Sequence, residues 1–297
     1  MHGEPERVPY ALVALHYGDP AAARELIEDA ATWSSPPDVI VVADNSSDFV
    51  FAGASAPCPL RVLSMGGNLG YGAAINRGIA EAGALGYESV LVMTQDCRLA
   101  PEAAELLLDV LAASDHVAAV GPLLVYSSRP ELVFSAGGRL TPWGRTLHPG
   151  QGTAVRAVEL TGPREADWLD GACLALRVPA VVEVGGFAEQ FFLYVEEVEL
   201  QLRLRKAGYR VLVVPRARAS QEPGRYSLYY KYRNLCAFTA THRDVLKGWP
   251  WYFAWPKDSL RMLRKGRPEE ALWAVRGLVD WRRGRYGPQP RGILGSN

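Results

Sequence analysis

The alternation of apolar and polar residues predicts a series of strands and helices over the first 125 residues. Short, apolar, β-prone runs predict strands, which fall at 8–15, 38–43, 60–64, 89–94 and 117–125. Ala-rich or amphipathic segments between them predict helices, at 20–33, 71–84 and 100–113. Asp19 is the expected N-cap of the first helix, with Pro20 at its first helical position. This rhythm predicts the α/β fold class, with a mainly parallel central sheet flanked by helices.

Polar residues follow three of the predicted strands. The strand ends carry His16-Tyr17-Gly18-Asp19, Asp44-Asn45-Ser46-Ser47-Asp48 and Thr94-Gln95-Asp96. Ligands of parallel sheets bind beyond the carboxyl ends of the strands, and an Asp there can accept hydrogen bonds from a nucleotide or bind a divalent cation. The segment 44–48 is also a good turn and capping sequence by itself. Both interpretations stay open from the residues alone.

A glycine-rich segment, 66–78, precedes and opens the second predicted helix. Its glycines allow positive φ and close approach of the backbone to a ligand. The spacing is not that of a dinucleotide fingerprint, and no Gly-Lys-Ser/Thr follows, so it is not a P-loop. An oxidoreductase of doubly wound fold is therefore disfavoured.

Composition describes an ordinary globular protein. The 297 residues are 48% hydrophobic and 22% charged, and 32 Lys and Arg balance 32 Asp and Glu, which disfavours a nucleic-acid partner. The four cysteines form no CxxC pair, so neither a zinc site nor a disulfide framework is expected. With a polar N-terminus and no apolar run of roughly 18 residues, the expected location is cytoplasmic.

The charge is unevenly distributed along the chain. Residues 225–297 hold 15 Lys and Arg against 5 Asp and Glu, which leaves 17 and 27 for residues 1–224. The basic part also carries five of the eight tryptophans, Trp249, Trp251, Trp255, Trp273 and Trp281. Such a segment suits peripheral contact with an anionic membrane, but also a helical tail with a solvated basic face, a cover for the acidic part, or a homodimer contact.

Four segments together resemble family 2 glycosyltransferases of the GT-A fold, in particular the bacterial rhamnosyltransferase-like branch. The first two are 44–48 and Asn68-Leu69-Gly70-Tyr71-Gly72-Ala73-Ala74-Ile75-Asn76-Arg77-Gly78, with Asp96 after the fourth strand. The third is Asp167-Trp168-Leu169-Asp170-Gly171-Ala172-Cys173, and the fourth runs from Gly185-Gly186-Phe187 to Tyr194-Val195-Glu196-Glu197-Val198-Glu199-Leu200. Tyr229-Tyr230-Lys231-Tyr232-Arg233-Asn234 and the segment 277–287 extend the resemblance, which covers about residues 8–287 in order.

The resemblance implies a domain plan and an activity. Residues 1–225 would form the GT-A domain, with a donor half at about 8–125 and an acceptor half at about 126–225, and 226–297 a basic, Trp-rich helical region. The implied reaction is inverting transfer of a sugar, with a deoxysugar such as rhamnose favoured, from a dTDP- or UDP-linked donor to a glycan precursor or small natural product. Mg²⁺ or Mn²⁺ would be the cofactor.

The resemblance also assigns roles to residues. The donor would contact Ala14, His16, Tyr17, Asp44, Asn68, Gly70, Tyr71, Gly72, Asp96, Tyr230 and Arg233, with Asp44 at the nucleobase and Tyr230 and Arg233 at the diphosphate. The acceptor side would include Trp168, Asp170 and Gly171. The metal would bind at Asp96, assisted by Gln221.

Glu197 would be the general base, supported by Glu196 and Glu199. Acids in the first turn of a helix also stabilise its dipole without any catalytic role, so the helix predicted to run to about Lys206 admits both interpretations. Val198, Leu200, Leu202 and Leu204 are spaced to form its buried face, which leaves Glu197 directed to a cleft. The three neighbouring carboxylates are expected to raise one another's pKa.

Three positions depart from the family pattern. Glu196-Glu197 stands where relatives usually have Glu-Asp, Gln221 where many relatives have a metal-binding His, and Ala188 where Asp is common. An amide oxygen suits Mg²⁺ but is a poor ligand for transition metals. The alternative function is therefore a GT-A protein that binds nucleotide sugars with little or no transfer. Among the remaining residues, His116 is expected to be exposed, His148 to lie in an acceptor-side loop, and Cys97 not to act as a nucleophile.

Overall fold

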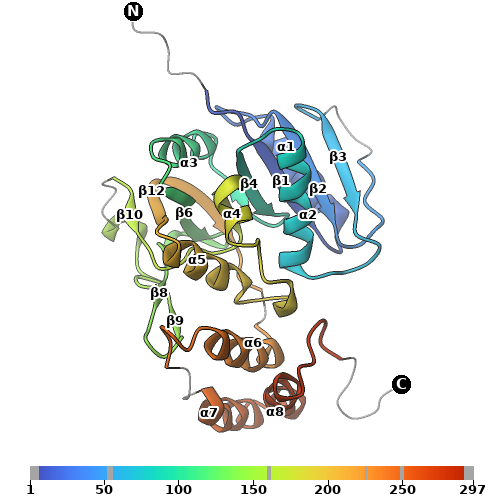
Figure 1. Cartoon of the computed structure of the whole chain (residues 1–297), viewed down its shortest axis with the longest axis vertical. Helices are drawn as coiled ribbons and strands as arrows, with labels where there is room; N and C mark the ends of the chain where they lie inside the picture. Colours follow the sequence, from blue (N-terminus) through green and yellow to red (C-terminus); the bar gives the residue numbers. More distant parts are fainter. Residues whose placement is uncertain (1–6, 52–55, 159–161, 225, 248–250, 291–297) are drawn as a thin grey trace, which may run out of the picture.

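The computed structural model describes residues 7–51, 56–158, 162–224, 226–247 and 251–290 (Figure 1). Its centre is a ten-stranded sheet in the order β10-β12-β6-β11-β4-β1-β2-β3, with β5 paired to β12 and β7 to β6. A separate hairpin joins β8 and β9. Helices cover both faces of the sheet, and three further helices follow at one end of the molecule.

The donor half confirms the predicted parallel arrangement. Its strands are β1 (Ala11–His16), β2 (Val39–Asp44), β3 (Leu60–Ser64) and β4 (Ser89–Thr94), all parallel in the order β3-β2-β1-β4. The helices are α1 (Pro20–Ala30), α2 (Tyr71–Ala84) and α3 (Ala103–Ala112), and β5 (Arg98–Leu99) is a short strand before α3. Three predicted ranges match residue for residue, and the other ends differ by one to three residues. The carboxylate of Asp19 accepts the N–H of Ala21 at 2.9 Å, as its predicted role as N-cap requires.

Successive residues of each strand point to opposite faces of the sheet and build two cores. Leu12 and Ile40 pack with α1 and α3 on one face. Val13 and Val41 pack with α2, α4 and α5 on the other. These strands are buried on both faces, which explains why their sequences are continuously apolar.

The chain after residue 125 adds antiparallel pairings to the predicted sheet. The strand β11 (Cys173–Arg177) lies between β4 and β6 (Val117–Tyr126) and is antiparallel to both. The chain makes a long excursion before β11 returns to the middle of the sheet. That excursion includes β7 (Arg129–Ser135), β8 (Arg139–Leu140), β9 (Thr146–Leu147), the 3₁₀ turn η1 (Val155–Ala157) and β10 (Arg164–Glu165). The local rhythm of apolar residues does not specify which neighbour a returning strand joins.

The last part of the sheet domain positions the acidic residues Glu196, Glu197 and Glu199. After β11 come α4 (Val178–Glu183), the 3₁₀ turn η2 (Glu189–Phe191), α5 (Glu196–Lys206) and β12 (Arg210–Gln221). The strand β12 runs parallel to β6 with irregular register, and it ends at Gln221. The bounds of α5 match the prediction, and the four apolar residues proposed for its buried face are all buried.

Three helices follow the sheet: α6 (Leu228–Thr241), α7 (Trp251–Arg264) and α8 (Pro268–Arg282). They lie at the end of the molecule away from α3 (Figure 1). Leu228 and Tyr232 of α6, Met262 of α7 and Ala274 of α8 form a small core of their own. Within the described ranges, no helix combines the length and apolarity needed to cross a bilayer.

Candidate active site

A cavity of about 590 Å³ gathers residues from both halves of the chain. Thr94 and Asp96 line it after β4, Asp170 and Gly171 before β11, Glu196 and Glu197 at the start of α5, and Gln221 at the end of β12. Arg145, Thr146 and His148 reach it from the β8–β9 hairpin region, and Tyr226, Lys231 and Leu235 from around α6. The structure therefore brings together the acceptor-side, catalytic and metal residues that were predicted separately.

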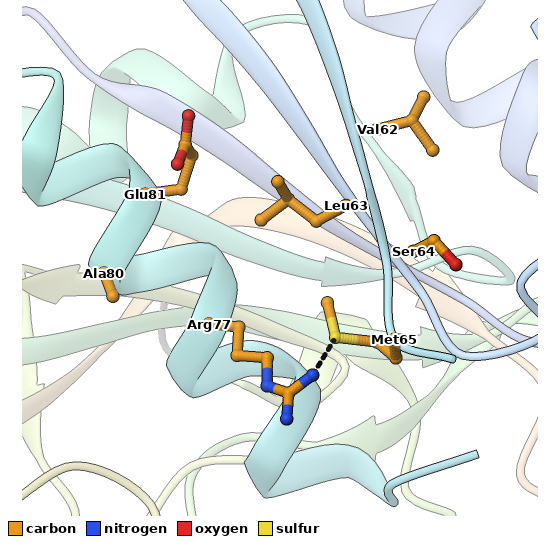
Figure 2. A pocket seen from close by; sticks show the side chains of 7 residues that line it. All are labelled: Val62, Leu63, Ser64, Met65, Arg77, Ala80 and Glu81. Atoms are coloured by element: carbon orange, nitrogen blue, oxygen red, sulfur yellow. Dashed lines mark hydrogen bonds between the residues drawn. The ribbon is translucent and has the colours of Figure 1, made fainter. Parts of the chain in front are cut away.

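A second cavity, of about 530 Å³, lies between β3 and α2 (Figure 2). Its polar lining is small: Arg77 donates to the sulfur of Met65 at 3.6 Å, and Glu81 pairs with Arg61. None of the predicted site residues lines this cavity. The larger cavity is therefore the candidate active site.

The glycine-rich turn at Gly70 packs against the loop of Phe192 and so positions one wall of the cavity. Gly70 has a φ of 87°, and a Cβ there would lie 2.3 Å from the carbonyl oxygen of Phe192. This close approach lets the N–H of Tyr71 donate to the same carbonyl at 2.8 Å. The hydroxyl of Tyr71 donates to the carbonyl of Gly171 at 2.7 Å. Through these contacts the turn connects the loops of Phe192 and Gly171 at the cavity. Asn68 shapes the turn by accepting the N–H of Gly70 at 2.9 Å. Asn68, Gly70 and Tyr71 are all predicted donor residues.

The loop before α5 is held in an unusual backbone conformation. Phe192, Tyr194 and Val195 all have positive φ, at 66°, 70° and 79°. This is costly for a β-branched residue such as Val195, so surrounding contacts must enforce it. Asn234 of α6 donates from its amide to the carbonyls of Phe191, Leu193 and Tyr194. This strained turn is followed directly by Glu196 and Glu197, which line the cavity.

Arg233 and Tyr230, predicted at the donor diphosphate, contact the loop before α5. Arg233 is fully buried, its guanidinium donates to the carbonyls of Phe191 and Gly287, and it lies over the rings of Tyr229 and Tyr230. The hydroxyl of Tyr230 accepts the N–H of Gln289 at 2.7 Å. Neither residue lines the cavity, and Arg233 supports the loop before α5, so the contact of both with the diphosphate stays a prediction. The sequence motif around Arg233 does not specify whether its side chain points into the protein or toward the cavity.

Glu196, which is buried, and Glu197 and Asp170, which are half-buried, form an acidic group with few partners. Burial raises the pKa of Glu196 to about 7. Burial first, and then the charges of Glu196 and Asp170, raise the pKa of Glu197 well above its usual range. Burial also raises the pKa of Asp170, against the lowering effect of His148. Among the described residues, Oε2 of Glu196 and Oδ2 of Asp170 have no hydrogen-bond partner. Such atoms facing a cavity suit a polar ligand.

Glu199 differs from its neighbours and corrects the prediction for the three acids. Its carboxylate receives two-point hydrogen bonds from Arg203, at 2.6 to 2.9 Å, and lies 2.9 Å from Nε2 of His242. Although burial opposes it, these hydrogen bonds hold the pKa of Glu199 below its ordinary value. Glu199 does not line the cavity. It belongs to a structural contact between α5 and the end of α6.

Asp96 and Gln221 are brought together as the metal prediction requires. The amide nitrogen of Gln221 lies 3.2 Å from both carboxylate oxygens of Asp96 and 3.3 Å from the hydroxyl of Thr94. Turning the amide about its last bond would place its oxygen on the same side, since the two amide atoms are nearly isosteric. A carboxylate, an amide oxygen and a hydroxyl are hard donors that fit Mg²⁺ or Mn²⁺. The residues present therefore fit such an ion.

A second acidic group lies at the ends of β1 and β2 and is formed by His16, Asp44 and Asp48. Their ligand atoms lie within 4.8 Å of one another, and Nε2 of the buried His16 is without a hydrogen bond in the described structure. The carboxylate of Asp44 accepts the N–H groups of Ser46, Ser47 and Phe49, which is the turn chemistry considered above. None of the three lines the cavity of Glu197.

Two other predicted donor residues lie on β1 and just after it. Ala14 is 1% exposed in the middle of β1, where β2 and β4 pair with it on both sides, so its donor contact stays a prediction. Tyr17 is exposed, and its backbone forms two hydrogen bonds with the Gln95 side chain.

His148 is a site residue that sequence reasoning left undecided. Its ring stacks on Phe134, contacts Trp168 edge to face, and brings Nδ1 to 3.9 Å from Oδ2 of Asp170. Trp168 is itself 3% exposed and donates to the carbonyl of Arg139. The Gly/Pro-rich stretch around His148 was the only signal of this role. His116 is exposed and Cys97 buried with a strongly raised pKa, as their inert assignments require.

The fold is that of GT-A glycosyltransferases. The structure resembles GalNAc-T7 solved with UDP, GalNAc and Mn²⁺, with a TM-score of 0.58 and 11% identity over 82% of this chain, which spans about half (52%) of that protein. It also resembles the mannosyltransferase PcManGT from Pyrobaculum calidifontis in complex with GDP-Man and Mn²⁺, with a TM-score of 0.56 and 16% identity over 96% of this chain and 77% of the other. At these identities the likeness concerns the fold.

The sequence comparisons identify the family. The model "Glycosyltransferase like family 2" matches residues 9–237. An N-acetylglucosaminyl-diphospho-decaprenol L-rhamnosyltransferase of Mycobacterium tuberculosis is 32% identical over 227 residues, covering 69% of this chain and 73% of the relative. Rhamnosyltransferase WbbL of Escherichia coli K12 is 41% identical over 49 residues, 16% of this chain and 19% of WbbL. The chain belongs to glycosyltransferase family 2 and is rhamnosyltransferase-like within it.

Proposed function

We propose that this glycosyltransferase transfers a sugar from a dTDP- or UDP-linked donor to an acceptor hydroxyl with inversion at the anomeric carbon. The observation that carries the proposal is that Glu197, at the start of α5, and Asp96, just after β4, line one cavity. A base on one side and a diphosphate-binding group on the other are what a single in-line displacement requires. A deoxysugar such as rhamnose is the favoured donor sugar, supported by the likeness to the mycobacterial rhamnosyltransferase.

Glu197 is the proposed general base. The acceptor hydroxyl gives its proton to the Glu197 carboxylate while its oxygen forms a bond to C1 of the sugar. The bond between C1 and the diphosphate oxygen breaks, and its electron pair leaves with the diphosphate. The raised pKa of Glu197 suits this task, because a carboxylate with an ordinary pKa is a weak base near neutral pH.

Asp96 and Gln221 are the proposed metal ligands, with Thr94 beside them. A bound Mg²⁺ or Mn²⁺ would neutralise charge on the donor diphosphate and so improve the leaving group. The group of His16, Asp44 and Asp48 is a less suitable site for that ion, because it lies outside the cavity that contains Glu197. We assign His16 and Asp44 to the nucleoside end of the donor instead.

The acceptor is proposed to bind against Asp170, Gly171, Trp168 and His148. Nδ1 of His148 and Oδ2 of Asp170 face each other at 3.9 Å without a hydrogen-bond partner in the described part of the chain. An acceptor hydroxyl would donate to the carboxylate of Asp170, which lines the cavity. The mycobacterial relative is named for a lipid-linked N-acetylglucosaminyl diphosphate acceptor, and an acceptor of that class is proposed here.

Calorimetric titration tests the donor site. UDP, dTDP, GDP and ADP are each titrated with and without Mg²⁺ or Mn²⁺, and we expect metal-dependent binding of a pyrimidine diphosphate. Asp96→Asn should remove the metal dependence, whereas Asp109→Asn, an exposed acid on α3, should not change it. Metal-independent binding would contradict the role of Asp96, and failure of all four nucleotides to bind would contradict the donor site.

A second function, nucleotide-sugar binding with little transfer, is favoured by one observation. Gln221 replaces the histidine of many relatives and, as an amide, holds a cation less tightly. Transfer and binding without transfer both predict nucleotide binding in the titration, and only the first predicts turnover. Mass spectrometry of the acceptor after incubation with dTDP-rhamnose or UDP-sugars separates them, since only the transferase adds a sugar mass.

A further inference from the structure

The helix α7 presents apolar residues to solvent along one side. Phe253, Leu260 and Leu263 are 71%, 47% and 53% exposed, and Pro256 is exposed between them. Their spacing of three, four and three residues places them on one face of the helix. The opposite face is buried, where Met262 joins the core of the three helices and Ser259 donates to the carbonyl of Ala271 at 2.9 Å. The exposed residues are therefore not part of that core.

Cations border this apolar face. Lys257 and Arg264 are exposed and lie one turn or less from Leu260 along the helix surface, followed by Lys265. Arg261 pairs with Asp258 at 3.2 Å, but no acidic side chain in the described ranges pairs with Lys257, Arg264 or Lys265. The region 225–297 as a whole holds 15 Lys and Arg against 5 Asp and Glu. A helix with an apolar stripe beside unpaired cations has the pattern of segments that lie in the headgroup layer of a bilayer.

This helix is joined directly to the wall of the active-site cavity. Asp258, on the inner side of α7, accepts from Nζ of Lys231 at 2.6 Å and from the hydroxyl of Tyr232 at 2.8 Å. Lys231 and Leu235 of α6 line the cavity. Figure 1 shows α7 at the end of the molecule, beyond α6 as seen from the sheet. A surface that binds the outer side of α7 would therefore lie one helix away from the cavity.

We propose that the outer face of α7 docks the enzyme on a membrane surface rich in anionic phospholipid headgroups. The apolar residues enter the boundary of the acyl chains, and Lys257, Arg264 and Lys265 lie among the headgroups. A symmetric dimer through the same face is disfavoured, because it would place identical basic borders against each other. The proposal does not depend on which sugar or acceptor the active site takes.

Vesicle flotation with the full chain tests the proposal. Vesicles of phosphatidylcholine with about 30 mol % phosphatidylglycerol should bind the protein, and binding should weaken in about 0.5 M NaCl because salt screens the headgroup charge. Lys257→Gln/Arg264→Gln should lower the partition coefficient about 25-fold, from about 1 kcal/mol per cation. Leu260→Ser/Leu263→Ser should lower it at least about tenfold.

Matched controls remove similar groups elsewhere on the surface. Val50→Ser/Val182→Ser deletes two side chains that are 64% and 66% exposed, and Arg216→Gln/Arg218→Gln removes two exposed cations of β12. Both controls should bind as wild type does. Circular dichroism melts verify that every variant is folded, and titration with nucleotides should show donor binding unchanged, which keeps this test separate from that of the active site.

Three results would overturn the proposal. The first is wild-type protein that does not float with anionic vesicles, and the second is α7 variants that bind as well as the controls. The third is light scattering that shows a dimer abolished by Leu260→Ser/Leu263→Ser, which would assign the face to a second copy of the chain.

Discussion

The first two turns of α5 carry acidic residues on two sides, and the pKa values of the two sides shift in opposite directions. On the cavity side, Glu196 and Glu197 lie in a nearly unpaired cluster, and burial raises the pKa of both. On the other side, Glu199 is satisfied by Arg203 and His242, and its pKa is lowered. Both groups are removed from water, so burial alone does not explain the difference.

The difference lies in the partners that each side of the helix meets. Glu199 faces protein, where a two-point arginine and a histidine compensate for the loss of water. Glu197 faces a cavity, where the compensating group must come from a ligand. Buried acids without partners cost stability in the free protein, and this pattern is typical of functional sites. One helix thus combines a cavity side, which is proposed to be catalytic, and an anchoring side.

The largest expected effect tests the catalytic side. Glu197→Gln should lower the rate of transfer about 10³-fold, because the amide cannot accept the hydroxyl proton. Nucleotide binding by calorimetry should change little. The control Glu105→Gln removes an exposed acid from the first turn of α3 and should leave the rate unaltered. Transfer at the wild-type rate by Glu197→Gln would remove Glu197 from the mechanism.

The anchoring side should respond in stability. Glu199→Ala leaves Arg203 and the buried His242 without their acceptor and should destabilise the fold by about 3 kcal/mol. Removing the exposed acid of the Arg210–Glu165 pair by Glu165→Ala should cost less than about 1 kcal/mol. Urea melts provide the measurement, and equal losses for the two variants would show that Glu199 is not an anchor.

The pH dependence of that loss has a definite sign. The folded pKa of Glu199 lies below its unfolded value, so its ionised form stabilises the fold above the unfolded value, and this contribution is lost as pH falls through the folded pKa. The destabilisation by Glu199→Ala should therefore be full at pH 7 and shrink in melts taken progressively below pH 4.5. A loss independent of pH would indicate that the carboxylate charge is irrelevant.

Glu196 should show the opposite sign. Its folded pKa of about 7 lies above the value of 4.5 in the unfolded chain, so wild type loses stability as pH rises between these values. Glu196→Gln should therefore stabilise the protein at pH 8, by up to about 3 kcal/mol, and have little effect near pH 4. Glu105→Gln should show no such trend. Melts of Glu196→Gln that track wild type from pH 4 to pH 8 would contradict the raised pKa.

The smallest effect concerns how the two cavity-side acids interact. The charge of Glu196 is the second cause, after burial, of the raised pKa of Glu197. Glu196→Gln should then move the acidic limb of the rate profile to lower pH, because Glu197 ionises more easily. The pH dependence of transfer measures this shift, and a limb that stays in place or moves to higher pH would show that the two groups are not coupled.

Local sequence was sufficient for much of this molecule. The continuous apolar runs of 89–94 and the Ala-rich segment 71–84 predicted β4 and α2 to the residue, because fully buried strands and a helix opened by glycine have strong local signatures. The start of α5 was also predicted, and with it the direction of Glu197, since the spacing of Val198 and Leu202 determines which face is buried. The resemblance of the motifs added the family, which the comparisons confirm.

Other features depended on contacts between distant segments. The antiparallel entry of β11, the withdrawal of Ala14 into the core and the enclosure of Arg233 under the loop before α5 involve partners far away in sequence. The same holds in part for Glu199, whose pKa is lowered against the effect of burial by His242, 43 residues further on, and by Arg203. Local periodicity determines which residues turn inward, because it follows from backbone geometry. Tertiary packing alone decides which partner an inward residue meets. It therefore also decides whether an acid is paired within the fold or faces the cavity without a partner.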